Sequence, residues 1–136
     1  MPKIDIDAAP RGDGTTYPDA FAGPCLPRRR WKLGDAAGLS QFGVNLLRLP
    51  DGAWSNQRHW HEAEDEFVMV VEGEVILVED EGETVLRAGD CAAWPCGTGL
   101  HHHLVNLAQA AIEHHAQLRP FALEPVHPVV AERRDL

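Results

Sequence analysis

The stretch that decides the fold runs from Gly52 to Gly73 and reads GAWSNQRHWHEAEDEFVMVVEG. It carries two histidines one residue apart, His59 and His61, and a glutamate, Glu66, five residues further on. Alternate side chains of a β-strand share a face, so both imidazoles would point one way and Trp60 the other. Imidazole nitrogens suit Fe, Ni, Cu and Zn, and a carboxylate oxygen also admits Mn. The pattern favours a metal site, although the histidine pair alone is equally typical of an exposed strand.

A second segment, from Gly89 to Asn106, reads GDCAAWPCGTGLHHHLVN. Five residues separate its first glycine from Pro95, and His102 stands four positions before Asn106. The two segments, joined by an apolar hairpin, together resemble the paired motifs of the cupin superfamily, a group of small β-barrels. The resemblance covers about residues 41–107. It departs from the family pattern by one extra residue before His59 and by two extra residues between Gly97 and His102.

The resemblance implies an all-β fold, a cupin-type small barrel of the double-stranded β-helix, jelly-roll or RmlC-like kind. It also implies one divalent transition metal ion per chain, with Mn or Fe favoured by the carboxylate and Ni, Zn or Cu compatible with the imidazoles. The residues at the ligand positions of the motifs are His59, His61, Glu66 and His102.

The triplet His101-His102-His103 requires a choice between neighbours. Strand alternation places the first and third histidines on one face and His102 on the other. Only His102 has the family spacing to Asn106, so we expect it to point inward and the other two outward. We expect His114, His115 and His127, which lie outside the motifs, to be solvated.

The rest of the chain predicts three regions: an N-terminal arm, partly β, over 1–40, a barrel core over 41–107 and a tail over 108–136. In the core, apolar alternation and turn residues predict strands over 41–49, 53–61, 66–72, 74–79 and 84–86. We expect Gly73 and Gly89 to need positive φ where strands end.

In the tail, residues 107–118 favour a short helix. Beyond it, Pro120, Pro125 and Pro128 favour irregular structure, so a partner subunit could supply a missing edge.

An arginine-rich segment in the arm, Arg28-Arg29-Arg30-Trp31-Lys32-Leu33, has two interpretations. Charged side chains are typical of an edge strand, which they protect from further pairing. Alternatively, the arginines form a clamp for a phosphorylated or carboxylated substrate, because guanidinium groups bind such anions bidentately. We favour the solvated edge, which is the usual behaviour of a charge run.

Composition limits the partners. The chain has 136 residues and a formal net charge of −9, which disfavours nonspecific binding to nucleic acid or anionic membranes. No apolar run approaches the ~20 residues of a membrane span, and the first residues do not resemble a signal peptide, so we expect a cytoplasmic protein. Its three cysteines indicate neither a disulfide framework nor a zinc site. We expect a homodimer that binds a small molecule.

Three functions fit these observations. The first is a metalloenzyme, an isomerase, epimerase or dioxygenase of the cupin type, because four ligands leave open positions on an octahedral ion. The second is a non-catalytic sensor or storage protein for a sugar, a sugar phosphate or an organic acid, and the third is a purely structural metal site. The sequence identifies no catalytic residue: Glu62, Glu64 and Asp65 are candidate acids or bases, but they equally fit solvated loop charges.

Overall fold

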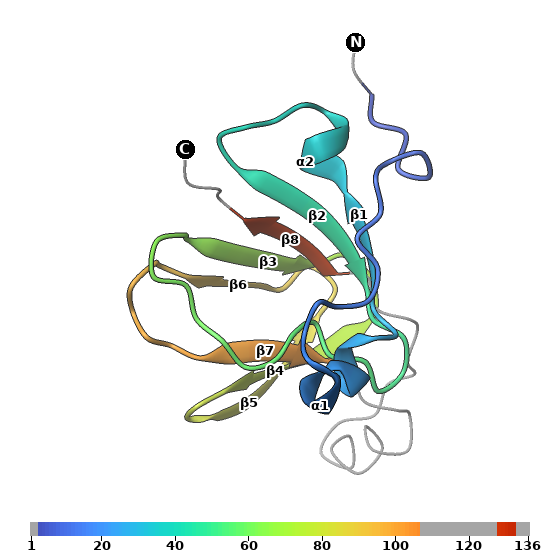
Figure 1. The fold of residues 1–136 in the computed structure, drawn as a ribbon. Coiled ribbons are helices and arrows are strands. Elements are labelled where there is room, and N and C mark those ends of the chain that lie inside the picture. The colour runs from blue at the N-terminus through green and yellow to red at the C-terminus, as the bar shows by residue number, and fades with distance from the viewer. Residues whose placement is uncertain (1–2, 107–127, 133–136) are drawn as a thin grey trace.

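The computed structural model describes residues 3–106 and 128–132, and its strands form two antiparallel sheets (Figure 1). One sheet has the strand order β1-β2-β8-β3-β6, and the other has the order β5-β4-β7. The strands are β1 (Arg29–Lys32), β2 (Gly43–Arg48), β3 (Glu66–Val70), β4 (Glu74–Glu79), β5 (Gly82–Arg87), β6 (Cys91–Trp94), β7 (His102–Val105) and β8 (Pro128–Glu132). The all-β, jelly-roll class predicted from the sequence is confirmed.

The helical segments are α1 (Asp19–Ala22), η1 (Gly23–Cys25) and α2 (Leu33–Ala36). None of the described helices is long and apolar enough to cross a membrane. The arm ahead of α1 runs beside β1 in Figure 1 and pairs with it through Gly12, whose N–H donates to the Arg30 carbonyl at 2.9 Å. β1 is thus the last strand of its sheet, with its outer edge covered by the arm.

The core lies between the sheets and follows from the period of two along the strands. In β3, the buried side chains of Glu66, Val68 and Val70 alternate with the exposed ones of Phe67 and Met69. Apolar side chains of the other inner faces complete the core: Leu47, Leu49, Ala53, Val75, Leu77, Leu86, Trp94 and Leu104. Glu66 is therefore a carboxylate at the end of an apolar inner face, a placement that requires polar partners.

The strand predicted over 53–61 does not form. In its place the chain makes two isolated bridges, Trp54 with Val105 and His59 with His102. Between them, Ser55 uses its hydroxyl oxygen, not its carbonyl, to accept the N–H of Leu104 at 2.9 Å. A side chain that replaces the backbone acceptor interrupts the ladder. Sequence alternation could not reveal this local competition.

The tail also differs from the prediction of a short helix or irregular structure over 108–136. Residues Pro128–Glu132 form β8, which pairs with β2 on one side and β3 on the other. Pro128 stands at the first position of that strand, where a missing N–H is tolerated. The helix expected over 107–118, His114, His115 and His127 lie outside the described residues.

Two glycines confirm the predicted strand ends. Gly73 and Gly89 have φ values of 74° and 93°, which other residues adopt only at a cost. The first glycine lies between β3 and β4, and the second lies just before β6. Both turns direct the chain back across the barrel.

Candidate metal centre

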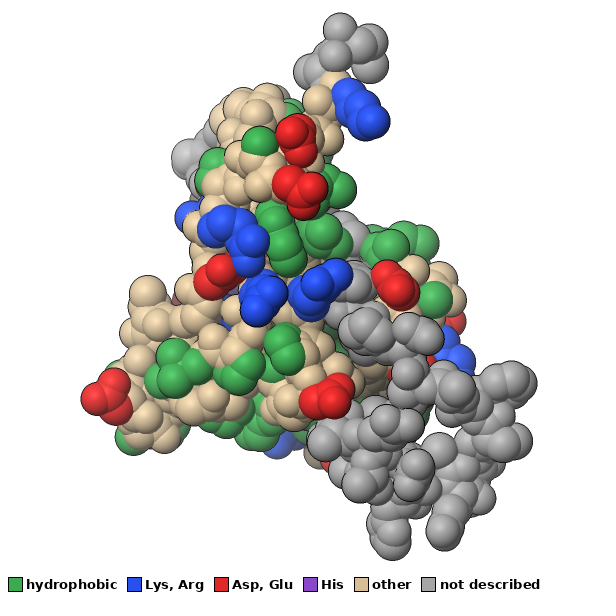
Figure 2. Space-filling model, turned by 90° about the vertical axis from the view of Figure 1, so that its right-hand side faces the viewer, with side chains coloured by type: hydrophobic (Ala, Val, Ile, Leu, Met, Phe, Trp, Pro, Cys, Tyr) green, Lys and Arg blue, Asp and Glu red, His purple; other side chains and the backbone are tan. Residues whose placement is uncertain are grey.

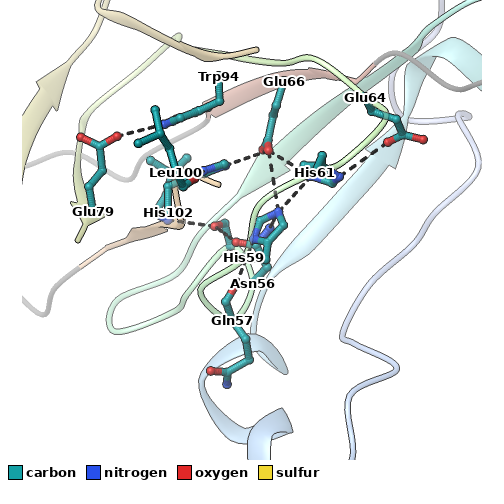
Figure 3. A network of polar contacts seen from close by, with 12 residues as sticks. Asn56, Gln57, His59, His61, Glu64, Glu66, Glu79, Trp94, Leu100 and His102 are labelled. Atoms are coloured by element: carbon teal, nitrogen blue, oxygen red, sulfur yellow. Dashed lines mark hydrogen bonds and ion pairs between the residues drawn. The ribbon is translucent and has the colours of Figure 1, made fainter. Parts of the chain in front are cut away.

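The candidate site lies where three segments meet at one end of the barrel (Figure 3). Glu66 is the first residue of β3 and His102 is the first residue of β7, while His59 and His61 belong to the loop that precedes β3. His59 and His102 exchange both backbone hydrogen bonds, at 3.2 and 2.9 Å, so the loop is fixed against β7. The His61 carbonyl accepts the N–H of Gly97 at 2.8 Å, which ties the same loop to the turn after β6.

The three predicted histidines converge on one atom of the predicted carboxylate, Oε2 of Glu66. The Nε2 atoms of His102, His61 and His59 lie 2.8, 3.1 and 3.7 Å from it. The Nε2 atoms of His59 and His61 are 3.1 Å apart. Two ligand atoms about 2.1 Å from one ion and at right angles to each other are about 3 Å apart. The ligand atoms of His59, His61 and Glu66 all lie within 4.8 Å of one another, which fits a single ion, and His102 adjoins this group through Glu66.

The outer nitrogens of the imidazoles fix how the rings are protonated. Nδ1 of His59 lies 2.9 Å from the Gln57 carbonyl, and Nδ1 of His102 lies 3.0 Å from the Leu100 carbonyl. A carbonyl can only accept, so each Nδ1 carries a hydrogen and each Nε2 presents a lone pair when the ring is neutral. The carboxylate of Glu64, 3.7 Å from Nδ1 of His61, favours the same tautomer there.

This arrangement fits a metal ion. Lone pairs on the neutral Nε2 atoms would face the lone pairs of a buried carboxylate, which is unfavourable unless a cation lies among them. In a metal-free protein a proton can take that place, and the raised pKa of His102 favours this residue as its carrier. A divalent ion would satisfy the donor atoms of His59, His61 and Glu66 at once, and these are imidazole and carboxylate ligands that Mn, Fe, Ni, Cu and Zn accept.

The pKa values agree with this account. Burial lowers the pKa of His59 below its ordinary value and outweighs the attraction of Glu66. Burial acts the same way on His102, but the hydrogen bonds to Glu66 and to the Leu100 carbonyl overcome it, so the pKa of His102 is raised. Burial would raise the pKa of Glu66, yet the hydrogen bond from His102 and the charges of the imidazoles hold it below its usual range. Glu66 is therefore ionised at neutral pH.

Trp94 supports His102 from the side away from the other ligands. The two rings are stacked, with centroids 3.7 Å apart and planes 5° from parallel. The indole Nε1–H of Trp94 donates to the carboxylate of Glu79 at 3.0 Å, which fixes the indole in turn (Figure 3). The indole thus makes a direct contact with a candidate ligand.

A pocket of about 230 Å³ opens beside these ligands. Its apolar lining comes from the inner faces of the strands, and its polar lining includes residues from the arm and the loop before β3. The lining residues are Tyr17, Arg28, Arg30, Leu47, Ser55, Asn56, His59, His61, Glu66, Val68, Trp94, His102 and Leu104. A ligand bound here would touch both the candidate metal ligands and two arginines.

Sequence reasoning missed Tyr17 and Asn56. The hydroxyl of Tyr17 accepts the N–H of Gln57 at 3.2 Å, which links the arm to the loop that holds His59. The amide of Asn56 lies 3.2 Å from Nε2 of His59. Neither residue belongs to a recognisable motif, and only the path of the arm over the barrel mouth brings Tyr17 to the pocket.

The other candidates lie elsewhere. His101 is exposed and pairs with Asp80 at 3.3 Å. His103 faces away from the ligands as expected but is not solvated, because it is buried against Trp54 with ring centroids 4.6 Å apart. Burial and nearby positive charges lower the pKa of His103 to about 4.

The candidate acids and bases of the 62–65 loop do not line the pocket. Glu64 contacts His61 on the side of the ring away from Glu66. Asp65 accepts the backbone N–H of Cys96 at 2.8 Å and so ties the loop to the turn after β6. Glu62 is exposed. These carboxylates therefore have structural or solvated positions.

Comparison with known proteins defines the class. The family model described as "Cupin domain" matches residues 45–113, and the chain therefore belongs to the cupin family. Among solved structures, it is similar to a cupin-superfamily sugar phosphate isomerase from Silicibacter pomeroyi DSS-3, with 42% identity and a TM-score of 0.84. That match covers 98% of this chain and 76% of the other.

Two further structures extend the comparison. A proposed sugar phosphate isomerase from Acidithiobacillus ferrooxidans ATCC 23270 is 26% identical, with a TM-score of 0.65 over 79% of this chain and 60% of the other. The polyketide cyclase RemF from Streptomyces resistomycificus is 15% identical, with a TM-score of 0.69 over 98% of this chain and 78% of the other, and shares the fold alone. No curated protein sequence matches the chain significantly.

Proposed function

We propose that this protein binds one divalent transition metal ion per chain through His59, His61, Glu66 and His102 and isomerises a small sugar-derived compound at that ion. The observation that supports it most directly is the convergence of three imidazole nitrogens on Oε2 of the buried Glu66. The similarity to a sugar phosphate isomerase at 42% identity supports the reaction class. Mn or Fe fits the mixed donor set best, and Ni, Zn and Cu are compatible with it.

Four protein ligands leave two positions of an octahedral ion for a substrate. When bound, the ion would polarise a carbonyl or enediol oxygen as a Lewis acid. The apolar walls formed by Leu47, Val68 and Leu104 would exclude water from the reacting atoms. The Tyr17 hydroxyl accepts a hydrogen bond from Gln57, so its own proton can be donated to a substrate oxygen in the pocket.

The test combines metal analysis with isotope exchange. The protein is purified without chelators and its metal content is measured. It is then incubated in D₂O with a panel of hydroxy-aldehydes and hydroxy-ketones, with and without phosphate groups. An isomerase that moves a proton between adjacent carbons incorporates deuterium, which NMR detects. We expect about one ion per chain and exchange that His59→Ala abolishes and His101→Ala retains.

A non-catalytic binding function is the second candidate. Among the described residues that line the pocket, Glu66 is the only carboxylate, and it is a proposed ligand. A general base other than a ligand is therefore not evident there. Tight binding of a panel compound without any deuterium exchange by the metal-loaded protein would favour a sensor or storage role over the isomerase.

A further inference from the structure

The inner face of β1 is basic. Arg29 at the start of this strand is exposed, whereas Arg30 on the strand and Arg28 just before it line the pocket that contains the candidate metal ligands. Arg30 pairs in register with Leu47, whose side chain is buried in the core. Barrel interiors are usually apolar, so arginines at these positions require a specific explanation.

Protection of an open sheet edge does not explain why Arg28 and Arg30 face the pocket. Inward-pointing charges can prevent a sheet edge from pairing with another chain. Here the arm already covers the edge of β1: Gly12 and Gly14 donate their N–H groups to the carbonyls of Arg30 and Arg28, at 2.9 and 3.2 Å. The Lys32 N–H donates to the Pro10 carbonyl at 2.8 Å. Because these backbone hydrogen bonds already occupy the edge of β1, the arginine side chains are not needed to prevent another strand from pairing there.

The two guanidinium groups are held in place in different ways. Arg28 donates through Nε to the Gly14 carbonyl at 2.7 Å and through Nη1 to the Ser55 carbonyl, so its position is fixed by the backbone. Arg30 lies against Gly12, where an added Cβ would come within 2.7 Å of Nε. The Nε of Arg30 is buried and has no hydrogen-bond partner among the described residues. A buried donor without a partner is costly unless a ligand supplies the acceptor.

We propose that Arg28 and Arg30 form an anion subsite that holds the phosphate or carboxylate group of the substrate while its other end reaches the metal ligands. Only the second part of this proposal, that the other end of the substrate reaches the metal ligands, rests on the proposed function. Guanidinium groups bind phosphate and carboxylate oxygens through paired, charge-assisted hydrogen bonds. The two positive charges match a phosphate dianion better than a carboxylate, so a phosphate ester is the favoured ligand.

The charge distribution of the molecule supports this assignment. The chain has a formal net charge of −9, which opposes the approach of a small anion. Yet Figure 2 shows several basic side chains close together on one face of the molecule, with acidic side chains beside them. A local concentration of positive charge on an acidic protein gives an anion a preferred place to bind.

The test compares neighbouring arginines on opposite faces of one strand. Binding of inorganic phosphate to the metal-loaded protein is measured by calorimetry for the wild type, Arg30→Gln and Arg29→Gln. Any coordination of phosphate to the metal is common to all three proteins and cancels. We expect Arg30→Gln to weaken phosphate binding about tenfold or more and Arg29→Gln to change it less than about twofold. Equal affinities for the three proteins, or no phosphate binding by the wild type at all, would overturn the subsite.

Two further measurements separate the alternatives. A parallel titration with acetate shows which class of anion the subsite prefers. Tighter binding of phosphate assigns the subsite to phosphate esters, and tighter binding of acetate assigns it to carboxylates. Metal content separates this inference from the proposed function. If the wild type takes up no metal but still shows phosphate binding that depends on Arg30, the metal-centred function fails and the subsite stands. Circular dichroism confirms that each variant is folded.

Discussion

Trp94 lies flat against His102, with ring centroids 3.7 Å apart and planes only 5° from parallel. The indole is itself anchored by its hydrogen bond to Glu79. A chain of contacts thus runs from a carboxylate on β4, through an indole on β6, to a candidate metal ligand on β7. Partners of this kind orient a ligand before the metal ion binds.

Trp94→Leu should therefore weaken metal binding about tenfold, within the range observed when outer partners of metal ligands are removed. Trp94→Phe, which keeps an aromatic ring, should lose less metal affinity than Trp94→Leu. Metal titration by calorimetry measures both variants, and tryptophan emission gives a second readout. Emission should change on metal addition in the wild type and in Trp31→Phe but much less in Trp94→Phe. An unchanged affinity in Trp94→Leu would limit the indole to core packing.

Replacement of single histidines tests the proposed ligand set. His59→Ala, His61→Ala and His102→Ala should each lower metal affinity by at least about tenfold, because each removes one donor. His101→Ala is the matched control, since this residue neighbours His102 but is exposed and pairs with Asp80. Elemental analysis and titration with Mn, Fe, Ni and Zn measure the effect. A larger loss from His101→Ala than from His102→Ala would show that the register of β7 is wrong.

Metal affinity should fall as the pH is lowered. The imidazoles bind metal only when Nε2 is unprotonated, so protons compete with the ion. The raised pKa of His102 places the onset of this competition above the ordinary histidine value of about 6.5, whereas the lowered pKa of His59 adds competition only at lower pH. Titrations from about pH 8 down to pH 5.5 should show about a tenfold loss per pH unit where one proton is displaced. A constant affinity over this range would argue against imidazole ligands.

Asn106 should contribute to stability, not to the metal site. Its buried amide donates to the Leu49 carbonyl at 2.7 Å and so ties the end of β7 to the end of β2. Asn106→Ala leaves that carbonyl without its partner and should cost about 1–3 kcal/mol of the free energy of unfolding. Thr98→Ala, which removes an exposed side-chain hydrogen bond to Pro95, is the control and should cost much less. Denaturant unfolding compares the two, and metal affinity should be unchanged in both.

Gly12 offers a test of the anion subsite that leaves both arginines in place. An added Cβ would meet the Arg30 side chain at 2.7–2.8 Å, so Gly12→Ala must displace the guanidinium. We expect it to weaken phosphate binding severalfold, by less than Arg30→Gln does. Gly23→Ala is the matched control, because an added Cβ there meets nothing within 4 Å. Equal phosphate affinities in the two alanine variants would mean that the position of Arg30 is unimportant for binding.

The grouping of the candidate metal ligands was largely predictable because most of the information is local. His59 and His61 are two residues apart, and Glu66 follows in the same motif, so their closeness in sequence indicated one site although the strand expected to carry the two histidines does not form. His102 required a choice of register, which its spacing to Asn106 provided. The structure groups His59, His61 and Glu66 and places His102 against Glu66, and their role as ligands stays a prediction.

The pocket around that centre was less predictable. The alternation of Arg28, Arg29 and Arg30 showed that they divide between two faces, but not which face looks inward. The interpretation as a solvated edge applies to Arg29 but not to its neighbours, which line the pocket. Tyr17 reaches the pocket only because the arm crosses the barrel mouth, a contact distant in sequence that no local pattern encodes.

The position of β8 has a consequence for how the protein is made. Among the described strands, β8 alone links β2 to β3 within their sheet, and it comes from a segment far beyond both in the chain. During synthesis, the facing edges of β2 and β3 therefore emerge from the ribosome long before the segment that joins them. Pairings between such distant segments form slowly, because a long loop must close first. Since β3 carries Glu66 and its first residue pairs with Glu132 of β8, a nascent chain should bind a metal ion stably only after residues 128–132 have emerged and paired.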